Sequence, residues 1–466
     1  MSRFIGRKQQ LGDLDRLLQR IASDTGARPG KALLVRGRRR VGKSRLVEEF
    51  LERAGVPFVF FTASTRSTEA ELRLFAEEVA FSSLPDAGLF REVTLTTWDA
   101  AFRLLAQALP DSGPSVVVID ELPYLKHSDD HFDGTLQKLF DRELSRRRVL
   151  VIGIGSDLAM MESLNAYGQP FHQRATEMVV PPLSPREVGD MLGLSAADSF
   201  DAFLVTGGLP LICDEWPAGA PLWDYLGQAL SSPTSALLVS AERALAAEFP
   251  PEAQARIVLG AIGAGERSFS NIGRAAGGLP QASLSRSLAT LTGKRAVAVD
   301  LPVSTRPSKE TRYRVADPYL RFWLTFLGPH LHEVERGRGD RVLERIERSW
   351  LSWRGRAVEP VVRESVARLP ESPGWVGGYW TRTNDPEIDL VLADRGPVAR
   401  QILTVGSIKW LERAPFDAHD FAALVHQRGQ LPGASADTPL LVVARAGCDV
   451  PGVRTLSADQ LLDAWR

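Results

Sequence analysis

Short apolar runs alternate with segments of helical periodicity through residues 1–183. The apolar runs lie at 32–35, 56–61, 116–119 and 149–154, and a fifth is expected after residue 174. Runs of this length without polar alternation are typical of parallel strands that are covered on both faces. Between them, the segments 68–80 and 97–109 place apolar residues at helical spacing. The pattern predicts an α/β fold built around a parallel sheet.

The pattern changes after residue 183. Helical periodicity over 184–245, interrupted at 206–210, predicts a helical lid. The next part combines three short helices and two short strands, which predicts a winged helix-turn-helix. The helices are expected at 253–260, 269–276 and 281–291, and the strands at 297–301 and 311–315.

The last part of the chain mixes helices and strands again. A connecting helix is expected at 333–348, and a separate helix opens at 353–359. Three strands follow, with one more helix between the second and the third of them. The strands are expected at 387–392, 402–410 and 439–443. Together the patterns divide the chain into four predicted domains, at 1–183, 184–248, 249–330 and 331–466.

The segment from Gly37 to Ser44 lies between the first apolar run and a helical pattern. It matches GxxxxGK[ST], the pattern of a phosphate-binding loop; the alternative is a basic turn that merely contains glycine. In such a loop backbone N–H groups surround phosphates, Lys43 reaches the β- and γ-phosphates, and the Ser44 hydroxyl is a ligand of Mg²⁺. The helix that begins near Lys43 directs its positive dipole end at the same phosphates. The candidate nucleotide-binding residues are Gly37, Arg38, Arg39, Arg40, Val41, Gly42, Lys43, Ser44 and Arg45.

Two acidic residues end the apolar run at 116–119. Asp120 comes at the carboxyl end of a buried strand, where it can hold Mg²⁺ through water. Glu121 is then placed to orient or deprotonate an attacking water. The alternative is an ordinary strand end that leads into a solvated turn.

Two further polar residues are catalytic candidates. Ser156 follows the apolar run 149–154, where it either senses the γ-phosphate and the attacking water or caps the next helix. Arg174 precedes the fifth strand, where it either stabilises the charge of the transferred phosphate or pairs with a neighbouring carboxylate.

Composition changes this picture little. The chain has 466 residues with 44% hydrophobic and 24% charged residues, which is typical of a globular protein with several cores. Because the formal net charge is −1, a nucleic-acid surface has to be a local patch. Cys213 and Cys448 predict neither a disulfide framework nor a zinc site and are expected as buried small side chains. No apolar run approaches the ~20 residues of a membrane span and the N-terminus lacks a signal-peptide core, so we expect a cytoplasmic protein without a membrane partner.

Several of these segments together resemble the archaeal-type ATPase family, in the signal-transduction branch of the AAA+-like P-loop ATPases. The resemblance rests on residues 4–7, 37–44, 116–121, 154–156, 173–176, 182–184 and 207–210. It implies a RecA-like parallel sheet with a helical lid, ATP as the ligand, and a switch-like cycle of slow hydrolysis. It also places residues 4–7 and the turn 208–210, with Pro210, near the adenine and Arg174 near the γ-phosphate. Gln10 departs from the family, which often has Glu there.

The predicted winged helix carries the local positive charge that the whole chain lacks. Polar residues flank Leu284 and Leu288 on its third helix, so one face can pack while the other meets DNA. The candidate DNA contacts are Arg274, Arg286, Lys294 and Arg295, with Arg306, Lys309 and Arg312 nearby. Docking of a partner protein is the alternative use of this surface.

The C-terminal segment resembles the nuclease-like domain of the same family, which is related to restriction endonucleases. That domain binds Mg²⁺ with an Asp on one strand and a Glu two residues before a Lys on the next. Glu359, Asp389 and Lys409 match, but Ser407 stands at the Glu position. A neutral hydroxyl cannot replace one of two carboxylates in holding the metal, so we expect a nuclease fold with lost or much reduced cleavage. Lys409 can still contact phosphate. The alternative is a plain α/β domain in which the acidic residues only cap helices or make the surface soluble. For Glu387 we expect only this second role.

The order of the predicted domains and the family resemblance together imply three possible functions. The first is an ATP-driven molecular switch that couples its nucleotide state, with Mg²⁺, to binding of DNA or a protein partner. The second is an ATP-licensed, metal-dependent DNA nuclease, against which Ser407 argues. The third is a regulatory scaffold that binds ATP without hydrolysing it.

Overall fold

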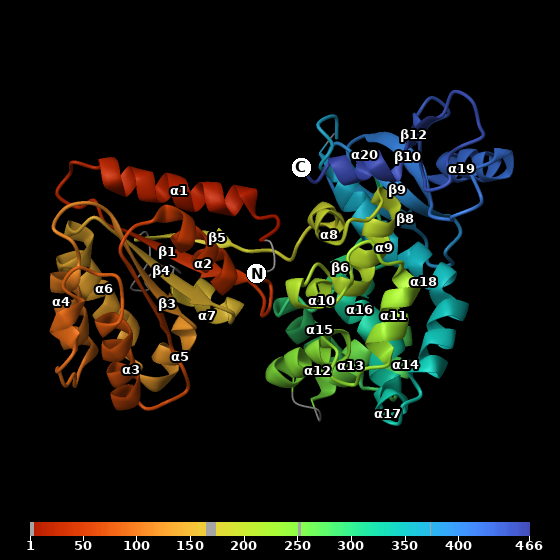
Figure 1. Ribbon diagram of the computed structural model, residues 1–466. Coiled ribbons are helices and arrows are strands. Elements are labelled where there is room, and N and C mark those ends of the chain that lie inside the picture. Colours follow the sequence, from red (N-terminus) through yellow and green to blue (C-terminus); the bar gives the residue numbers. More distant parts are fainter. Residues whose placement is uncertain (1–3, 165–173, 250–252, 373) are drawn as a thin grey trace. The chain divides into compact units, whose positions relative to one another are not determined.

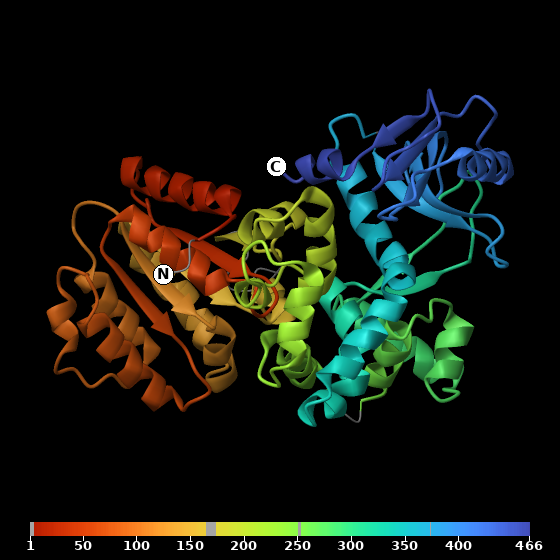
Figure 2. The ribbon, with the colours of Figure 1, turned by 45° about the vertical axis from the view of Figure 1, so that its right-hand side comes forward.

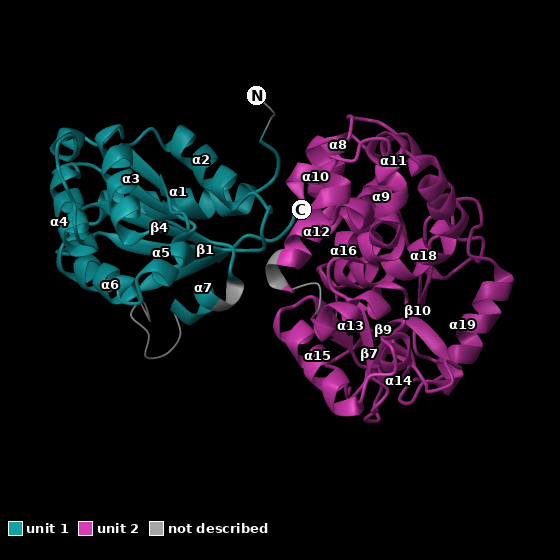
Figure 3. Cartoon of the chain, turned by 90° about the horizontal axis from the view of Figure 1, so that it is seen from below, with its two compact units in different colours: residues 1–182 teal, residues 183–466 magenta. Residues whose placement is uncertain are grey.

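The computed structural model describes residues 4–164, 174–249, 253–372 and 374–466. The chain divides into two compact units, residues 1–182 and 183–466 (Figure 3). Within the described ranges, none of the helices combines the length and apolar character that a membrane span requires.

The first unit is built on a parallel sheet with the strand order β2-β3-β4-β1-β5. Its strands are β1 (Lys31–Arg36), β2 (Phe58–Thr62), β3 (Ser115–Asp120), β4 (Val149–Gly155) and β5 (Ala175–Val179). All residues of β3 and β4 are buried, as their apolar runs predict. The parallel sheet is confirmed, although β2 starts two residues later than predicted.

Helices cover both faces of this sheet. They are α1 (Lys8–Ser23), α2 (Lys43–Ala54), α3 (Thr68–Ala80), α4 (Trp98–Ala108), α5 (Leu122–Ser128), α6 (Phe132–Arg142) and α7 (Leu158–Leu164). Figure 1 shows α1 and α2 on one face and α3, α4 and α6 on the other. On the second face, Phe75, Trp98 and Phe102 pack edge to face or stacked with ring centroids 5.6–5.7 Å apart, which anchors these helices to the strands.

The second unit begins with helices and a small ribbon. The helices are α8 (Pro185–Leu192), α9 (Ala196–Thr206), α10 (Pro210–Asp214), α11 (Leu222–Leu230), α12 (Ala236–Glu248), α13 (Gln254–Gly263), α14 (Phe269–Ala275), α15 (Gln281–Gly293) and α16 (Pro318–Phe322). The ribbon pairs β6 (Val297–Asp300) with β7 (Arg312–Val315) in antiparallel fashion. The order of three helices followed by two strands is the one predicted. That this group works as a winged helix stays a prediction.

One long helix replaces two predicted ones. After the short α17 (Leu331–Glu335), α18 runs without interruption from Gly339 to Ala367. The segments 333–348 and 353–359 are largely helical as predicted, but the prediction of a new helix that opens at 353–359 is wrong. The continuous helix includes Pro360, which removes one backbone hydrogen bond but leaves α18 in place between the helices and the C-terminal sheet (Figure 2).

The C-terminal sheet is mixed, with the order β12-β11-β10-β9-β8. Its strands are β8 (Trp375–Trp380), β9 (Glu387–Ala393), β10 (Ile402–Lys409), β11 (Leu440–Ala444) and β12 (Arg454–Leu456), with helices α19 (Ala418–Gln430) and α20 (Ala458–Asp463). β8, β9 and β10 pair antiparallel, whereas β10, β11 and β12 pair in parallel. The edge strands β8 and β12 are additions to the predicted set.

The predicted lid and the C-terminal sheet share one core. Phe200 and Leu204 of α9 lie in the same buried cluster as Val358 and Val362 of α18 and Leu390 of β9. Residues 183–466 accordingly form a single compact unit. The finer division of this unit into lid, winged helix and C-terminal domain stays a prediction.

Candidate nucleotide site

The loop between β1 and α2 has a conformation that its glycines make possible. Gly42 has φ of +84°, a left-handed conformation that side chains rarely adopt. A Cβ atom on Gly37 would lie 2.4 Å from the Val180 carbonyl oxygen, so no larger residue fits without a shift of the backbone. Gly42 directly precedes α2, so the unpaired N–H groups of the first helical turn lie next to the loop.

Lys43 is held inside this loop. Its side chain is buried, and its ammonium donates hydrogen bonds of 3.0 Å to the carbonyl oxygens of Gly37 and Arg38. Burial lowers the pKa of Lys43, while the negative charges of Glu121 and Asp120 raise it again. A buried cation that is compensated only in part favours an anionic ligand beside it.

Ser44 and Asp120 meet next to the loop. The Ser44 hydroxyl donates a hydrogen bond of 2.7 Å to Asp120 Oδ2, and Asp120 ends the buried strand β3. A hydroxyl and a carboxylate are the hard oxygen ligands that Mg²⁺ binds together with phosphate and water. The donor set therefore fits Mg²⁺ at the two positions predicted for it.

Glu121 and Ser156 complete the group. Glu121 has φ of +53°, a conformation that costs a non-glycine residue about 1–3 kcal/mol and that is found mostly at functional sites. Its carboxylate accepts a hydrogen bond of 3.3 Å from the Ser156 hydroxyl, since β3 and β4 are neighbours and end at the same edge of the sheet. The structure thus brings together Lys43, Ser44, Asp120, Glu121 and Ser156, which lie up to 113 positions apart in the sequence.

Arg7 supports the loop from behind and was missed as a functional residue. Its guanidinium is buried and donates a hydrogen bond of 2.9 Å to the carbonyl oxygen of Val41, in the middle of the loop. Phe4 lies beside the start of α2, with its ring centroid 5.9 Å from the guanidinium carbon of Arg45. The segment 4–7 therefore lies against the phosphate loop, whereas its nearness to adenine stays a prediction. The family resemblance includes Arg7 in the segment 4–7, but no pattern in the sequence predicts its contact with the phosphate loop.

Replacing Arg7 by Ala is expected to weaken ATP binding by about tenfold. The change leaves the buried Val41 carbonyl without this donor, which costs about 1–3 kcal/mol and loosens the loop. Titration with a fluorescent ATP analogue measures the effect. Arg16→Ala is the control, because Arg16 is exposed on α1 and pairs with Asp13; equal affinities of the two variants would contradict a supporting role for Arg7.

The predicted role of Arg174 requires a correction. Arg174 immediately precedes β5, and its guanidinium pairs with Asp141 at the end of α6, with 2.9 Å between Nε and Oδ2. All strands of this sheet begin at that edge, whereas the phosphate loop follows the opposite end of β1, about 15–20 Å away. Arg174 therefore does not reach the γ-phosphate position of its own chain. The pairing with a carboxylate is the alternative that the sequence left open; a contact with the site of another subunit stays a prediction.

Three other predicted positions are not brought into the group. The Arg45 side chain points along α2, where it pairs with acidic residues that include Glu49, at 3.0 Å. Pro210 begins α10 in the second unit, so its nearness to the adenine stays a prediction. Gln173, which contributes to the family resemblance, lies outside the described residues.

The four candidate DNA contacts are all exposed. Arg274 lies on α14, Arg286 on α15, and Lys294 and Arg295 directly after α15. On the other face of α15, Leu284 and Leu288 are buried, as predicted. Arg312 is different, because its guanidinium pairs with Glu387 at 2.7 Å and lies over the Trp380 ring. The expectation that Glu387 only caps or solubilises is therefore wrong, since it joins β7 to β9.

Asp389 and Ser407 bond to each other across the neighbouring strands β9 and β10, whereas Glu359 and Lys409 pair with other residues. Asp389 accepts hydrogen bonds from the Ser407 hydroxyl, at 3.1 Å, and from a backbone N–H, while Glu359 pairs with Arg363 at 3.0 Å. Burial raises the pKa of Glu359 to about 6, and the nearby Asp389 adds to this shift while Arg363 opposes it. Lys409 instead pairs with Asp420 of α19. Whether these residues are the remnant of a nuclease site stays a prediction.

A P-loop nucleotide site on a parallel α/β sheet is the class that this geometry defines. Residues 3–152, which include the loop, Asp120 and Glu121, match the family model described as AAA ATPase domain. The first unit is therefore similar to AAA ATPase domains. Residues 323–420 match a second family model, which is described as archaea bacterial proteins of unknown function.

Similar proteins are found among the archaea. A protein of Methanocaldococcus jannaschii that is described as uncharacterized is 22% identical over 440 residues, which cover 92% of each chain. Among solved structures, the Walker-type ATPase PABY2304 of Pyrococcus abyssi has a TM-score of 0.47 and 19% identity, over 69% of this chain and 96% of that one. The ORC2 protein of Aeropyrum pernix has a TM-score of 0.44 and 13% identity, over 72% and 94%. At TM-scores below 0.5, neither likeness says what this chain binds.

Proposed function

We propose that this chain is an ATP-hydrolysing molecular switch whose nucleotide state controls how the second unit binds DNA or a protein partner. One observation carries the nucleotide part: Ser44 donates to Asp120 at 2.7 Å beside the buried Lys43, with Glu121 next in the chain. These are the positions at which a P-loop site holds triphosphate, Mg²⁺ and the attacking water.

Each residue has a distinct task in this proposal. The loop N–H groups and Lys43 bind the phosphates, and Ser44 and Asp120 hold Mg²⁺, which neutralises phosphate charge when bound. Glu121 orients the attacking water and accepts its proton. Ser156 donates to the Glu121 carboxylate at 3.3 Å and so fixes its direction. Catalysis by these residues is mainly positioning and electrostatic stabilisation.

The DNA part rests on the exposed basic residues of the predicted winged helix. Arg274 and Arg286 lie on α14 and α15, and Lys294 and Arg295 follow α15, on a chain whose net charge is −1. Such a local patch suits the phosphate backbone of DNA. Docking of a protein partner on the same patch remains the alternative.

Phosphate release from ATP, measured with and without duplex DNA in Mg²⁺, tests both parts together. We expect turnover that DNA stimulates and a DNA affinity that differs between the ATP and ADP states. An ATP turnover rate that is the same with and without DNA, together with a DNA affinity that does not change with nucleotide, would contradict coupling to DNA. The switch would then act on a protein partner. An ATP-dependent rise in thermal stability would still establish nucleotide binding.

Replacing Lys43 by Ala is expected to weaken ATP binding by about 10–100-fold. The substitution removes a charge-assisted donor to the phosphates, which contributes about 1.5–3 kcal/mol. Isothermal titration with ATP and Mg²⁺ measures the affinity. Lys31→Ala is the matched control, because Lys31 is exposed at the start of β1, at the edge of the sheet opposite the loop. An unchanged affinity of the Lys43 variant would place the nucleotide elsewhere.

A further inference from the structure

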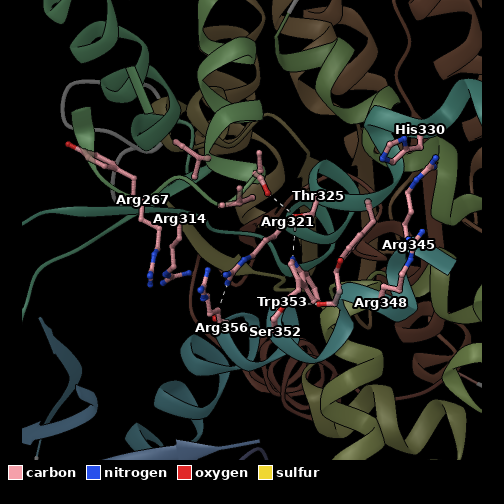
Figure 4. A pocket seen from close by; sticks show the side chains of 18 residues that line it. Arg267, Arg314, Arg321, Thr325, His330, Arg345, Arg348, Ser352, Trp353 and Arg356 are labelled. Atoms are coloured by element: carbon pink, nitrogen blue, oxygen red, sulfur yellow. Dashed lines mark hydrogen bonds between the residues drawn. The ribbon is translucent and has the colours of Figure 1, made fainter. Parts of the chain in front are cut away.

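The second unit holds a strongly basic pocket, and none of the predicted DNA contacts Arg274, Arg286, Lys294 and Arg295 lines it. It has a volume of about 700 Å³ and is lined by the end of α13, β7, α16 and α18 (Figure 4). Among the described residues, its lining includes six arginines and one histidine but no aspartate or glutamate. The arginines are Arg267, Arg314, Arg321, Arg345, Arg348 and Arg356.

Half of these arginines have ion-pair partners among residues that do not line the pocket. Arg267 pairs with Glu387, Arg314 with Asp300 and Arg345 with Glu333, at 3.3, 2.9 and 2.7 Å. For the other three, Arg321, Arg348 and Arg356, no carboxylate of the described chain lies within ion-pair distance of the guanidinium. The pocket therefore holds more positive charge than the surrounding protein neutralises.

Four of the guanidinium groups converge from separate segments. Figure 4 shows Arg267, Arg314, Arg321 and Arg356 pointing toward one another at one end of the pocket. The pKa of Arg321 is lowered to about 10, chiefly by burial and also by the positive charges of Arg314, Arg267 and Arg356, while Glu359 opposes the shift. Converging guanidinium groups repel one another, so an anion placed between them is favoured.

Pro360 explains how Arg321 is held without a carboxylate. Because proline has no N–H, the carbonyl of Arg356, four residues earlier in α18, receives no helical hydrogen bond from it. The Arg321 guanidinium donates to this carbonyl at 3.2 Å. The bond fixes the side chain but leaves its charge uncompensated. The remaining donors of Arg321 stay available to a ligand.

A stripe of arginine and serine side chains lies along the middle of α18. Arg345, Arg348, Ser349, Ser352 and Arg356 all line the pocket, at helical spacings of three, four and seven to eight residues. From the first to the last this stripe extends about 16 Å along the helix axis. A single phosphate group is too short to meet both ends, whereas one nucleic-acid strand places several phosphates over that length. Arginine forks and serine hydroxyls are the side chains that commonly bind such phosphates.

From the length and charge of this stripe, we propose that the pocket binds the sugar–phosphate backbone of a nucleic-acid strand, irrespective of base sequence. The site adds a second contact surface to the one predicted around Arg274 and Arg286. It extends the nucleic-acid part of the proposed function but requires neither ATP binding nor hydrolysis. Base sequence is not read, because donors that meet only phosphates carry no sequence information.

Charge reversal of two pocket arginines tests this proposal. Arg348 and Arg356 are exposed and have no ion pair to break in the described chain, so the double variant Arg348→Glu with Arg356→Glu is expected to fold. Full-length protein without nucleotide is titrated against labelled oligonucleotides of two unrelated sequences, and binding is followed by fluorescence anisotropy. We expect an affinity at least tenfold weaker for both sequences. The slope of log Kd against log salt should become shallower by about two, one for each lost phosphate contact.

Matched variants separate this result from a general effect of charge. Arg336→Glu with Arg341→Glu changes the net charge equally, on exposed residues that do not line the pocket. An equal loss in this control, or an unchanged affinity and slope in the pocket variant, would overturn the proposal. The milder double variant Arg348→Gln with Arg356→Gln should show a smaller loss in the same direction, which serves as a check if the reversal impairs folding.

Two further experiments distinguish a strand-binding pocket from a site for a compact anion and from binding at Arg274 and Arg286 alone. Competition with inorganic pyrophosphate separates an extended strand from a compact anion, and displacement of the oligonucleotide by micromolar pyrophosphate would contradict the proposal. Loss of affinity only in an Arg274→Glu, Arg286→Glu variant would overturn the pocket but leave the proposed function intact. ATP turnover without DNA should be the same in the pocket variant and the parent chain. A failure of turnover would count against the proposed function alone.

Discussion

Replacing Glu121 by Gln is expected to lower ATP turnover by a factor of about 100 or more, with ATP affinity changed by no more than a few-fold. The amide keeps the size of the side chain and can still accept the hydrogen bond from Ser156, but it cannot take a proton from the attacking water. Phosphates and metal are bound by other residues, so binding should persist. Phosphate release and ATP titration on the same samples separate the two quantities.

The matched variant for this experiment is Ser156→Ala. It removes the hydroxyl that fixes the Glu121 carboxylate at 3.3 Å and leaves the carboxylate itself in place. We expect a smaller loss of turnover, about tenfold, because Glu121 remains as a base that is less well oriented. Full turnover in the Glu121 variant would contradict the role of that residue, and it would favour a chain that binds ATP as a scaffold or uses another base.

Replacing Asp201 by Ala is expected to destabilise the second unit by about 3–5 kcal/mol. Asp201 of α9 accepts hydrogen bonds from Arg354 of α18, at 2.9 Å, and from Arg445, at 2.6 Å. Arg354 is completely buried, so removing this carboxylate leaves much of its charge uncompensated; its pairing with Glu412 at 2.7 Å persists. Burial raises the pKa of Asp201, while the two arginines lower it.

Tryptophan fluorescence during urea unfolding measures this change. Of the ten tryptophans only Trp98 belongs to the first unit, so the signal reports mainly on residues 183–466. Asp198→Ala is the control, since Asp198 lies on the same helix and also pairs with Arg445 but is half exposed. The Asp198→Ala substitution should lower the free energy of unfolding by less than about 1 kcal/mol. Equal midpoints for the two variants would show that the buried network does not hold α9 to the C-terminal sheet.

The nucleotide site was largely predictable because its parts are local. The loop from Gly37 to Ser44 carries its own spacing, and Asp120 and Glu121 end a run of apolar residues that can only be a buried strand. Parallel strands end at one edge of a sheet, so the loop and the acidic pair had to be near each other. Ser156 followed from the same rule. Its hydrogen bond to Glu121, however, requires that β3 and β4 be neighbours.

For Arg174 the same rule on strand ends predicts a place away from the phosphate loop. The residue precedes a strand, and the residue before a parallel strand lies at the amino edge, opposite the phosphate loop. The family resemblance pointed to the γ-phosphate instead, and the partner Asp141 lies 33 positions away with no pattern that connects the two residues. In α18 the patterns at 333–348 and 353–359 predicted two helices, but packing of one face against the C-terminal sheet keeps the helix continuous.

The sequence by itself determined the spacing of the phosphate loop, the parallel sheet that presents it, and the group of three helices and two strands at residues 253–315. These depend on spacing and periodicity within short segments, which local sterics and burial enforce. Only the tertiary structure decided that Arg7 supports the loop, that α9 belongs to the C-terminal core, and that six arginines from separate segments line one pocket. Such groupings arise when distant segments pack together, and nothing in the spacing of the residues along the chain records them.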